Sequence, residues 1–217
     1  MLLVLALALG CASASAAHAD NKELTTPATP TIITPPAGNS AFLVGRAKGT
    51  QGYTCLPAAP GSPTAASWTV NSARPEATLF LRFFGVDFQI ITHFLSPDTN
   101  PNDVPTVIPF GSPTWQSSLD SSKVWAQVFN KGMAKIDAGT DPISCPNTGS
   151  IACLLLQSIG SEAGPSGGTT LSKTTFIQRL NTNGGSAPAE NCSTLQDVGH
   201  QVLVPYTADY YFFQKDN

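Results

Sequence analysis

Charged side chains are scarce in this chain of 217 residues: Asp, Glu, Lys and Arg together make up 12% of it, and the net charge is −3. The few Lys and Arg residues are scattered along the sequence rather than clustered. A protein that binds nucleic acid needs a basic face for the phosphates, and an anionic membrane surface likewise attracts clustered basic residues. The sequence therefore predicts neither partner.

Long hydrophobic runs are also missing after the first residues of the chain. The apolar run Met1–Gly10 is shorter than the roughly 20 residues that span a bilayer, and small residues ending in Ala17-His18-Ala19 follow it. This order is typical of a secretory signal peptide. We predict a signal peptide over residues 1–19, with the Ala14–Ala16 stretch as the alternative cleavage site. The protein is then expected to be secreted, extracellular or associated with the cell wall, and to have no membrane span.

The glycine-rich motifs of nucleotide sites are absent, since neither G-x-G-x-x-G nor G-x-x-x-x-G-K-[ST] occurs. We therefore expect no nucleotide site and no cofactor. The segment Gly164–Gly168 does match the hydrolase pattern G-x-S-x-G, but that pattern requires a strand before the Ser and a helix after it. Pro165 before Ser166 and two glycines after it predict a flexible loop instead.

Four cysteines remain after the predicted cleavage, and an even number in an exported chain predicts two disulfides with three possible connectivities. We favour Cys55–Cys192 and Cys145–Cys153, because the second pair closes a short loop that is rich in turn-forming residues. A zinc site is the alternative, but no C-x-x-C pair is present. We predict no metal site.

The chain divides into a Pro/Thr-rich extended leader over residues 20–40 and a single β domain over residues 41–217. The domain alternates short apolar runs with Gly and Pro turns, which predicts an all-β fold, an antiparallel β-sandwich or barrel-like domain with long loops, braced by disulfides. Leu95–Pro113 is the longest irregular stretch, and Ile151–Ser158 suits either a strand or a helical turn. The predicted strands are Phe42–Arg46, Gly52–Cys55, Ser67–Val70, Thr78–Phe84, Val86–Phe94, Lys123–Phe129, Ile151–Ser158, Leu171–Leu180, Gln201–Tyr206 and Ala208–Phe213.

Only His93 and His200 remain as histidines after the predicted cleavage. His93 ends an apolar strand and could act as a general base together with Asp120 and Arg179, which makes these three the candidate catalytic residues. The alternative for His93 is a strand-end imidazole that bonds to the backbone.

Several aromatic residues, Trp115 and Tyr206 among them, could form a stacking surface for sugar rings, or could simply pack in the core. Asp209 and Arg179 are charges on strands that otherwise look half buried, so they need partners and could pair with each other. Trp115, Tyr206 and Asp209 are thus the candidate ligand-binding residues. Asn191 begins the sequon Asn-Cys-Ser and is a candidate glycosylation site.

A set of short motifs between Phe42 and Phe213 resembles a family of secreted fungal and bacterial proteins catalogued as a domain of unknown function. The motifs are Gly52-Tyr53-Thr54-Cys55, His93 with Gly111-Ser112-Pro113-Thr114-Trp115, Asp120-Ser121-Ser122-Lys123-Val124, Leu154-Leu155-Leu156, Ile177-Gln178-Arg179-Leu180-Asn181-Thr182, Gly184-Gly185-Ser186-Ala187-Pro188 and Pro205-Tyr206-Thr207-Ala208-Asp209-Tyr210-Tyr211-Phe212.

The resemblance implies export and a compact β fold, and it implies no established activity. The chain departs from the family pattern where Leu95–Phe110 intervenes between His93 and the Gly-Pro-Thr-Trp motif. Some members of the family carry an automatic label of malate dehydrogenase. We reject that label here, because the chain lacks a dinucleotide fingerprint and an alternating βα pattern.

Three functions remain as hypotheses. The first is a non-catalytic structural or interaction role outside the cell, with a wall or matrix polysaccharide or a protein as partner. The second is a binding module for carbohydrate or another small ligand, and the third is a hydrolase that uses His93 and Asp120. We rank them in this order, since fold and export alone do not establish a function.

Overall fold

The structure, a computed structural model, describes residues 24–58, 65–96 and 112–216. The predicted signal peptide and most of the predicted stretch Leu95–Pro113 lie outside these residues. The described helices are two short 3-10 turns, η1 (Thr31–Ile33) and η2 (Leu195–Asp197). No helix in the described ranges has the length and apolar character needed to cross a membrane.

Strands make up the rest of the regular structure, and every pairing among them is antiparallel. The all-β, disulfide-braced prediction is therefore confirmed. The strands are β1 (Asn39–Pro57), β2 (Ala66–Phe83), β3 (Val86–Ser96), β4 (Ser112–Ser117), β5 (Lys123–Val128), β6 (Lys135–Ile136), β7 (Cys153–Glu162), β8 (Phe176–Gly184) and β9 (Gln201–Lys215).

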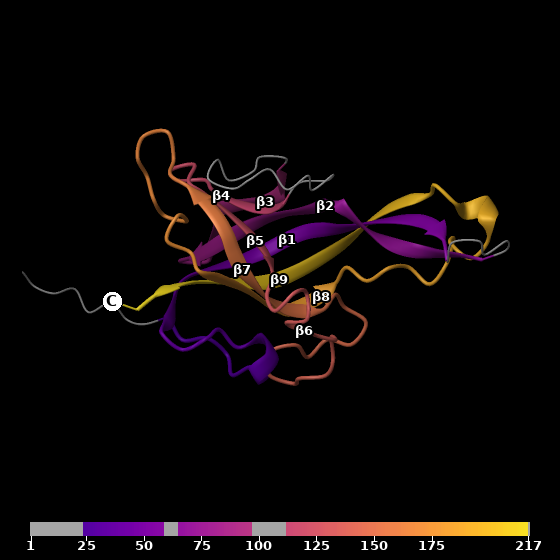
Figure 1. Cartoon of the computed structure of the whole chain (residues 1–217), viewed down its shortest axis with the longest axis horizontal. Coiled ribbons are helices and arrows are strands. Elements are labelled where there is room, and N and C mark those ends of the chain that lie inside the picture. Colours follow the sequence, from indigo (N-terminus) through magenta and orange to yellow (C-terminus); the bar gives the residue numbers. More distant parts are fainter. Residues whose placement is uncertain (1–23, 59–64, 97–111, 217) are drawn as a thin grey trace, which may run out of the picture.

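The strands close into a ring. Their order is β5-β4-β3-β2-β1-β9-β8-β7, and β5 also pairs with β7, so the first and last strands of the series meet. Strand β6 pairs with the beginning of β7, beyond the part that pairs with β5. Figure 1 shows β7 crossing over the long strands β1 and β9.

Three of the strands are longer than the sequence pattern predicts. Each of β1, β2 and β9 joins two predicted strands into one, so that β1 pairs with β9 from Asn39 to Thr54. A glycine supports the close contact of β1 with β2, since a Cβ atom at Gly49 would collide with Ala77 and with the carbonyl of Glu76. Glycine in a strand often marks such a close backbone approach.

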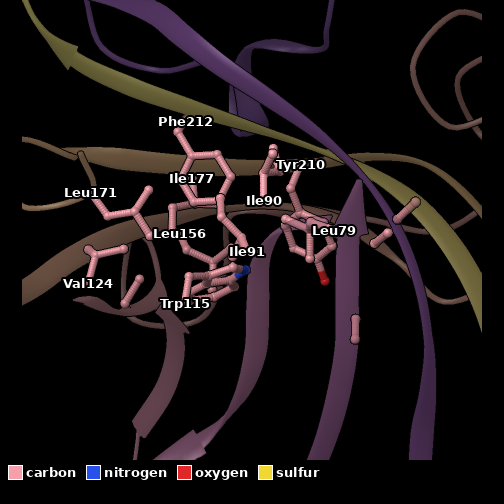
Figure 2. Close-up of a cluster of buried hydrophobic side chains, with 14 of the residues drawn as sticks. Leu79, Ile90, Ile91, Trp115, Val124, Leu156, Leu171, Ile177, Tyr210 and Phe212 are labelled. Carbon is pink, nitrogen blue, oxygen red and sulfur yellow. The ribbon is translucent and has the colours of Figure 1, made fainter. Parts of the chain in front are cut away.

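The main hydrophobic core fills the inside of the ring. Side chains from one face of successive strands meet there, as the two-residue period of a strand requires. Figure 2 shows them converging from several strands; among the fully buried ones are Leu79, Ile91, Trp115, Val124, Leu171, Ile177, Tyr210 and Phe212.

A second core lies outside the ring, on the outer face of β7, β8 and β9. The segment around η1 covers this face, where Ile33 is fully buried and its carbonyl accepts a hydrogen bond of 2.7 Å from Gln178 Nε2. Part of the predicted leader is thus packed on the domain. The proposed boundary at residue 40 stays a prediction.

Strands β1, β2 and β9 continue past the ring as a three-stranded arm, which Figure 1 shows extending away from the other strands. The Cys55–Cys192 disulfide joins β1 in this arm to the segment before η2. Near the ring, the Tyr53 hydroxyl donates a hydrogen bond of 2.7 Å to the Gly185 carbonyl. The base of the arm is therefore tied to the β8–β9 connection.

Candidate functional site

A cavity of about 590 Å³ opens where the arm leaves the ring, and each of the nine described strands contributes at least one residue to its wall. The floor consists of buried rings, among them His93, Trp115 and Tyr210. Exposed residues at the mouth include Lys135 and Ala187, so the cavity is open to solvent. A hollow of this size, mostly apolar with a few polar groups, is the usual form of a small-ligand site.

His93 lies at the floor of this cavity and is 4% exposed. Its ring stacks on Trp115 with 4.1 Å between ring centroids and an interplanar angle of 6°. Its Nδ1 atom lies 2.9 Å from the carbonyl oxygen of Thr114. Because a carbonyl can only accept, Nδ1 carries the proton and Nε2 of the neutral ring is an acceptor.

Burial keeps this imidazole uncharged. Burial is the largest cause that lowers the pKa of His93, the bond to Thr114 raises it and the nearby Arg179 charge lowers it, and together they bring this pKa to about 4. At neutral pH the floor of the cavity is therefore neutral at His93, and the positive charge lies on Arg179 in the wall.

Arg179, on β8, is half buried and lines the cavity. Its Nε and Nη2 atoms donate hydrogen bonds of 3.2 and 2.8 Å to the carbonyl oxygen of Ala152. Across the described residues no acidic side chain forms an ion pair with Arg179, and no Asp or Glu lines the cavity. Among the described residues the guanidinium thus has a neutral partner and no counter-charge.

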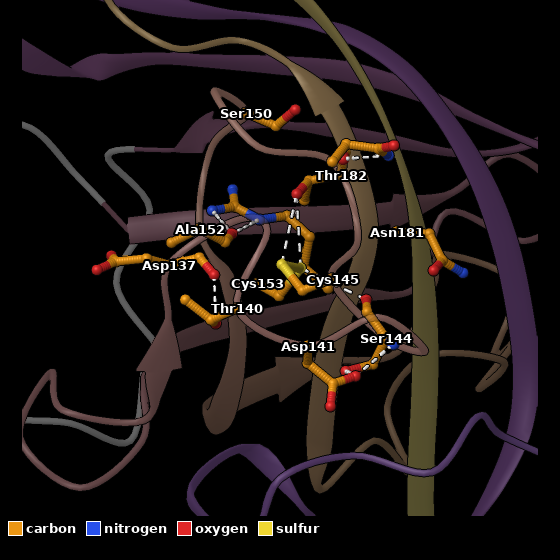
Figure 3. The surroundings of a disulfide bond; sticks show 12 residues. Asp137, Thr140, Asp141, Ser144, Cys145, Ser150, Ala152, Cys153, Asn181 and Thr182 are labelled. Carbon is orange, nitrogen blue, oxygen red and sulfur yellow. Dashed lines mark hydrogen bonds between the residues drawn. A yellow bond between two sulfur atoms is a disulfide. The ribbon is translucent and has the colours of Figure 1, made fainter.

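The Cys145–Cys153 disulfide holds the segment that presents the Ala152 carbonyl. Thr182 on β8 lies beside both sulfur atoms, and its hydroxyl donates a 2.6 Å hydrogen bond to the Ile151 carbonyl. Figure 3 shows Ala152 and Thr182 next to the Cys145–Cys153 disulfide. This wall of the cavity is therefore covalently braced from its outer side.

Two tyrosines complete the inner face of β9 near the site. The hydroxyl groups of Tyr206 and Tyr210 lie 3.1 Å apart, and burial raises the pKa of Tyr206 well above its ordinary value. Tyr206 is 3% exposed and Trp115 is 1% exposed. Neither ring offers a free face to solvent on which a sugar could stack.

Asp120 lies apart from His93 and Arg179, and it does not line the cavity. Its carboxylate accepts hydrogen bonds from the amide and hydroxyl of Ser122 and from the amide of Thr170. Burial alone raises its pKa, but these bonds outweigh burial and hold the pKa of Asp120 well below its usual range. In this arrangement the carboxylate connects the β4–β5 turn to the loop between β7 and β8.

That loop contains the Gly164–Gly168 match to the hydrolase pattern. Gly164 N donates to the Gly168 carbonyl and Gly167 N to the Gly164 carbonyl, and no helix follows. A Cβ atom at Gly164 or Gly168 would collide with Asp120. Gly164 and Gly168 therefore allow the loop to pack closely against Asp120.

Asp209 is on the outer side of the ring, where it accepts a 2.9 Å hydrogen bond from Asn181 Nδ2. It lines a separate polar groove together with Arg46, Lys48 and Asp87. Arg179 and Asp209 therefore do not pair with each other. Asn191 is exposed next to the disulfide-bonded Cys192, and its glycosylation stays a prediction.

The structure thus brings together three of the predicted site residues, His93, Trp115 and Arg179, and leaves Asp120 and Asp209 elsewhere. Sequence reasoning missed Tyr53 and Lys135 as cavity residues. The alternation of β1 could have placed Tyr53 on the inner face together with Ala47 and Gln51, since β1 keeps a continuous register with β9 through this stretch.

The surroundings of His93 in the cavity are aromatic and backbone groups. His93 is stacked and neutral, its Nδ1 is bonded to a backbone carbonyl, and no carboxylate in the described wall could orient or charge it. A catalytic base normally relies on such a partner. Over the described residues no group of three or more His, Cys, Asp or Glu side chains is placed to hold a metal ion.

Comparison with protein families found one match, over residues 36–214, to a family described as "Protein of unknown function (DUF3455)". This match covers most of the chain, including the described strands except the last residue of β9 and every described residue of the cavity. The chain belongs to this family. Searches of curated proteins and of solved structures found no match. Membership in DUF3455 confirms the resemblance seen in the sequence motifs and assigns no activity.

Proposed function

We propose that this DUF3455 protein is an exported, non-catalytic protein that binds a small ligand in the cavity at the base of the arm. The observation that carries the proposal is the convergence of a buried ring floor and a guanidinium that forms no ion pair with a described residue on one open cavity of about 590 Å³. Two disulfides and the predicted signal peptide support export, since disulfides persist in oxidising compartments.

A flat polysaccharide surface is less well supported. Such a surface needs exposed aromatic rings, and the candidates Trp115 and Tyr206 are buried. A small molecule, or the end of a chain that enters the cavity, fits the geometry better. We regard His93 as a wall residue whose tautomer is fixed by Thr114.

A thermal-shift screen of the mature, oxidised protein against saccharides, small organic acids and neutral aromatic compounds tests the proposal. A ligand at about a hundred times its dissociation constant should raise the unfolding free energy by about 2.7 kcal/mol. The variant Ala187→Trp places an indole at the mouth of the cavity, and we expect it to abolish the shift.

Ala163→Trp is the matched control, because Ala163 is also exposed and does not line the cavity. It should keep the full shift. A ligand that stabilises both variants equally binds somewhere else, and that result would contradict the proposal. So would the absence of a shift with every compound of the screen.

A further inference from the structure

The charge of the cavity wall is the feature that identifies a ligand class. In the part of the lining that the structure describes, the cationic side chains are Arg179 within the cavity and Lys135 at its mouth, and there is no Asp or Glu. The chain as a whole is acidic, with a net charge of −3. The cavity is therefore locally positive on a protein that is otherwise negative.

Arg179 has donors left over. A guanidinium carries five N–H groups, and the bonds from Nε and Nη2 to Ala152 engage two of them. Taking a charged group out of water is costly unless a counter-charge or further hydrogen bonds compensate it. The backbone carbonyl is neutral, so the counter-charge is missing from the described protein.

We infer that the ligand is an organic carboxylate with an apolar or aromatic body, and that Arg179 is the residue that binds its carboxylate group. Arg offers the planar fork of donors that matches a carboxylate. The inference rests on the proposed function, since it names the ligand of the same cavity.

The rest of the cavity fits the body of such a ligand. Apart from Arg179 and Lys135, the wall is built largely from apolar side chains, including Val70, Leu154 and Leu156, over the ring floor. One guanidinium within the wall balances a single negative charge. Lys135 is exposed at the mouth, where salt and water screen its contribution.

Matched pairs of acids and amides test the inference. Benzoate is compared with benzamide, and 3-phenylpropionate with 3-phenylpropanamide, by calorimetry and ligand-observed NMR on the full mature protein at neutral pH. Each pair shares its shape and differs in charge. We expect both acids to bind and to bind at least about tenfold more tightly than their amides, as for a charged hydrogen bond.

Three variants test whether Arg179 is responsible for the preference for acids over amides. Arg179→Gln should weaken acid binding about 10- to 100-fold and leave amide binding nearly unchanged, because only the charged partner is lost. Arg179→Lys should retain part of the preference for acids. Arg46→Gln removes an exposed cation from the outer groove and should change nothing. Thermal melts of the three variants confirm that each one is folded.

The outcomes separate the inference from the proposed function. Equal binding of acids and amides, or acid binding that Arg179→Gln leaves intact, overturns the carboxylate assignment. The same holds if a neutral saccharide or aromatic compound binds in the cavity and neither acid does, although the proposed function then stands. If no compound of either test binds, both the inference and the proposed function fail.

Discussion

His93 shows how burial decides the chemistry of a single residue. In the sequence it is a histidine at the end of an apolar strand; in the fold it is a stacked, neutral ring whose Nδ1 proton is held by the Thr114 carbonyl. The lowered pKa of this ring makes a prediction about stability, because the unfolded chain binds a proton at an ordinary histidine pKa and the native protein does not.

We predict that the unfolding free energy falls as the pH is lowered from about 6.5 to about 4, by up to about 1.4 kcal/mol per pH unit from His93 alone. In this window the unfolded state takes up the proton and the native state does not. His93→Asn, which keeps a donor for the Thr114 carbonyl, should remove this part of the slope. Urea unfolding at a series of pH values measures it.

His200 is the matched control for this experiment, because it is exposed. His200→Asn should keep the slope of the parent protein. Loss of the slope in both variants, or in neither, would show that burial of His93 does not control stability in this range. Asp120 does not interfere, since its lowered pKa places its contribution at more acidic values.

At the scale of an element, the hairpin between β2 and β3 has an unusual turn. Phe84 and Gly85 both have positive φ, 47° and 80°, and they lie between the paired residues Phe83 and Val86. Positive φ at both central residues is typical of a type I′ turn, which favours Asn-Gly. Phe84 is 90% exposed, so its ring gains little from packing.

We predict that Phe84→Asn raises the unfolding free energy by about 1 kcal/mol, the order of the cost of a left-handed conformation for an ordinary side chain. Phe84→Ala is the control, since it removes the ring without adding the preference of Asn for this turn. Chemical denaturation compares the three proteins. If Asn destabilises as much as Ala, then the edge contact of Phe84 with the Phe83 ring outweighs the turn.

At the scale of the whole molecule, the two disulfides restrain very different lengths of chain. Cys55 and Cys192 are separated by 137 residues, and Cys145 and Cys153 by 8. The first joins β1 in the arm to the segment before η2 and closes a loop that includes most of the domain. The second braces one wall of the cavity.

We predict that replacing Cys55 and Cys192 by Ala lowers the unfolding free energy more than replacing Cys145 and Cys153. Loop-closure entropy gives about 5 kcal/mol for the long loop and about 2.5 kcal/mol for the short one. Denaturant unfolding of both double variants gives the comparison. A smaller loss for the long loop would indicate that the arm unfolds on its own, separately from the ring.

The sequence by itself determined the class of this protein. Few charges, short alternating apolar runs with Gly and Pro between them, and four cysteines predicted an antiparallel β domain with two disulfides, and the structure has both the fold and the favoured pairing. These features are local, because side-chain alternation and turn chemistry can be read from neighbouring residues. The family resemblance was also visible in the motifs.

The tertiary structure alone decided how the strands close and which candidate residues meet. Ring closure depends on the pairing of β5 with β7, and no local pattern encodes which distant strands pair. His93 and Arg179 are 86 positions apart and share a cavity, whereas Asp120 stays with its own turn. Long-range register and burial set these positions. Candidate residues could therefore be selected from the sequence, but which of them lie together in the cavity could not be predicted from it.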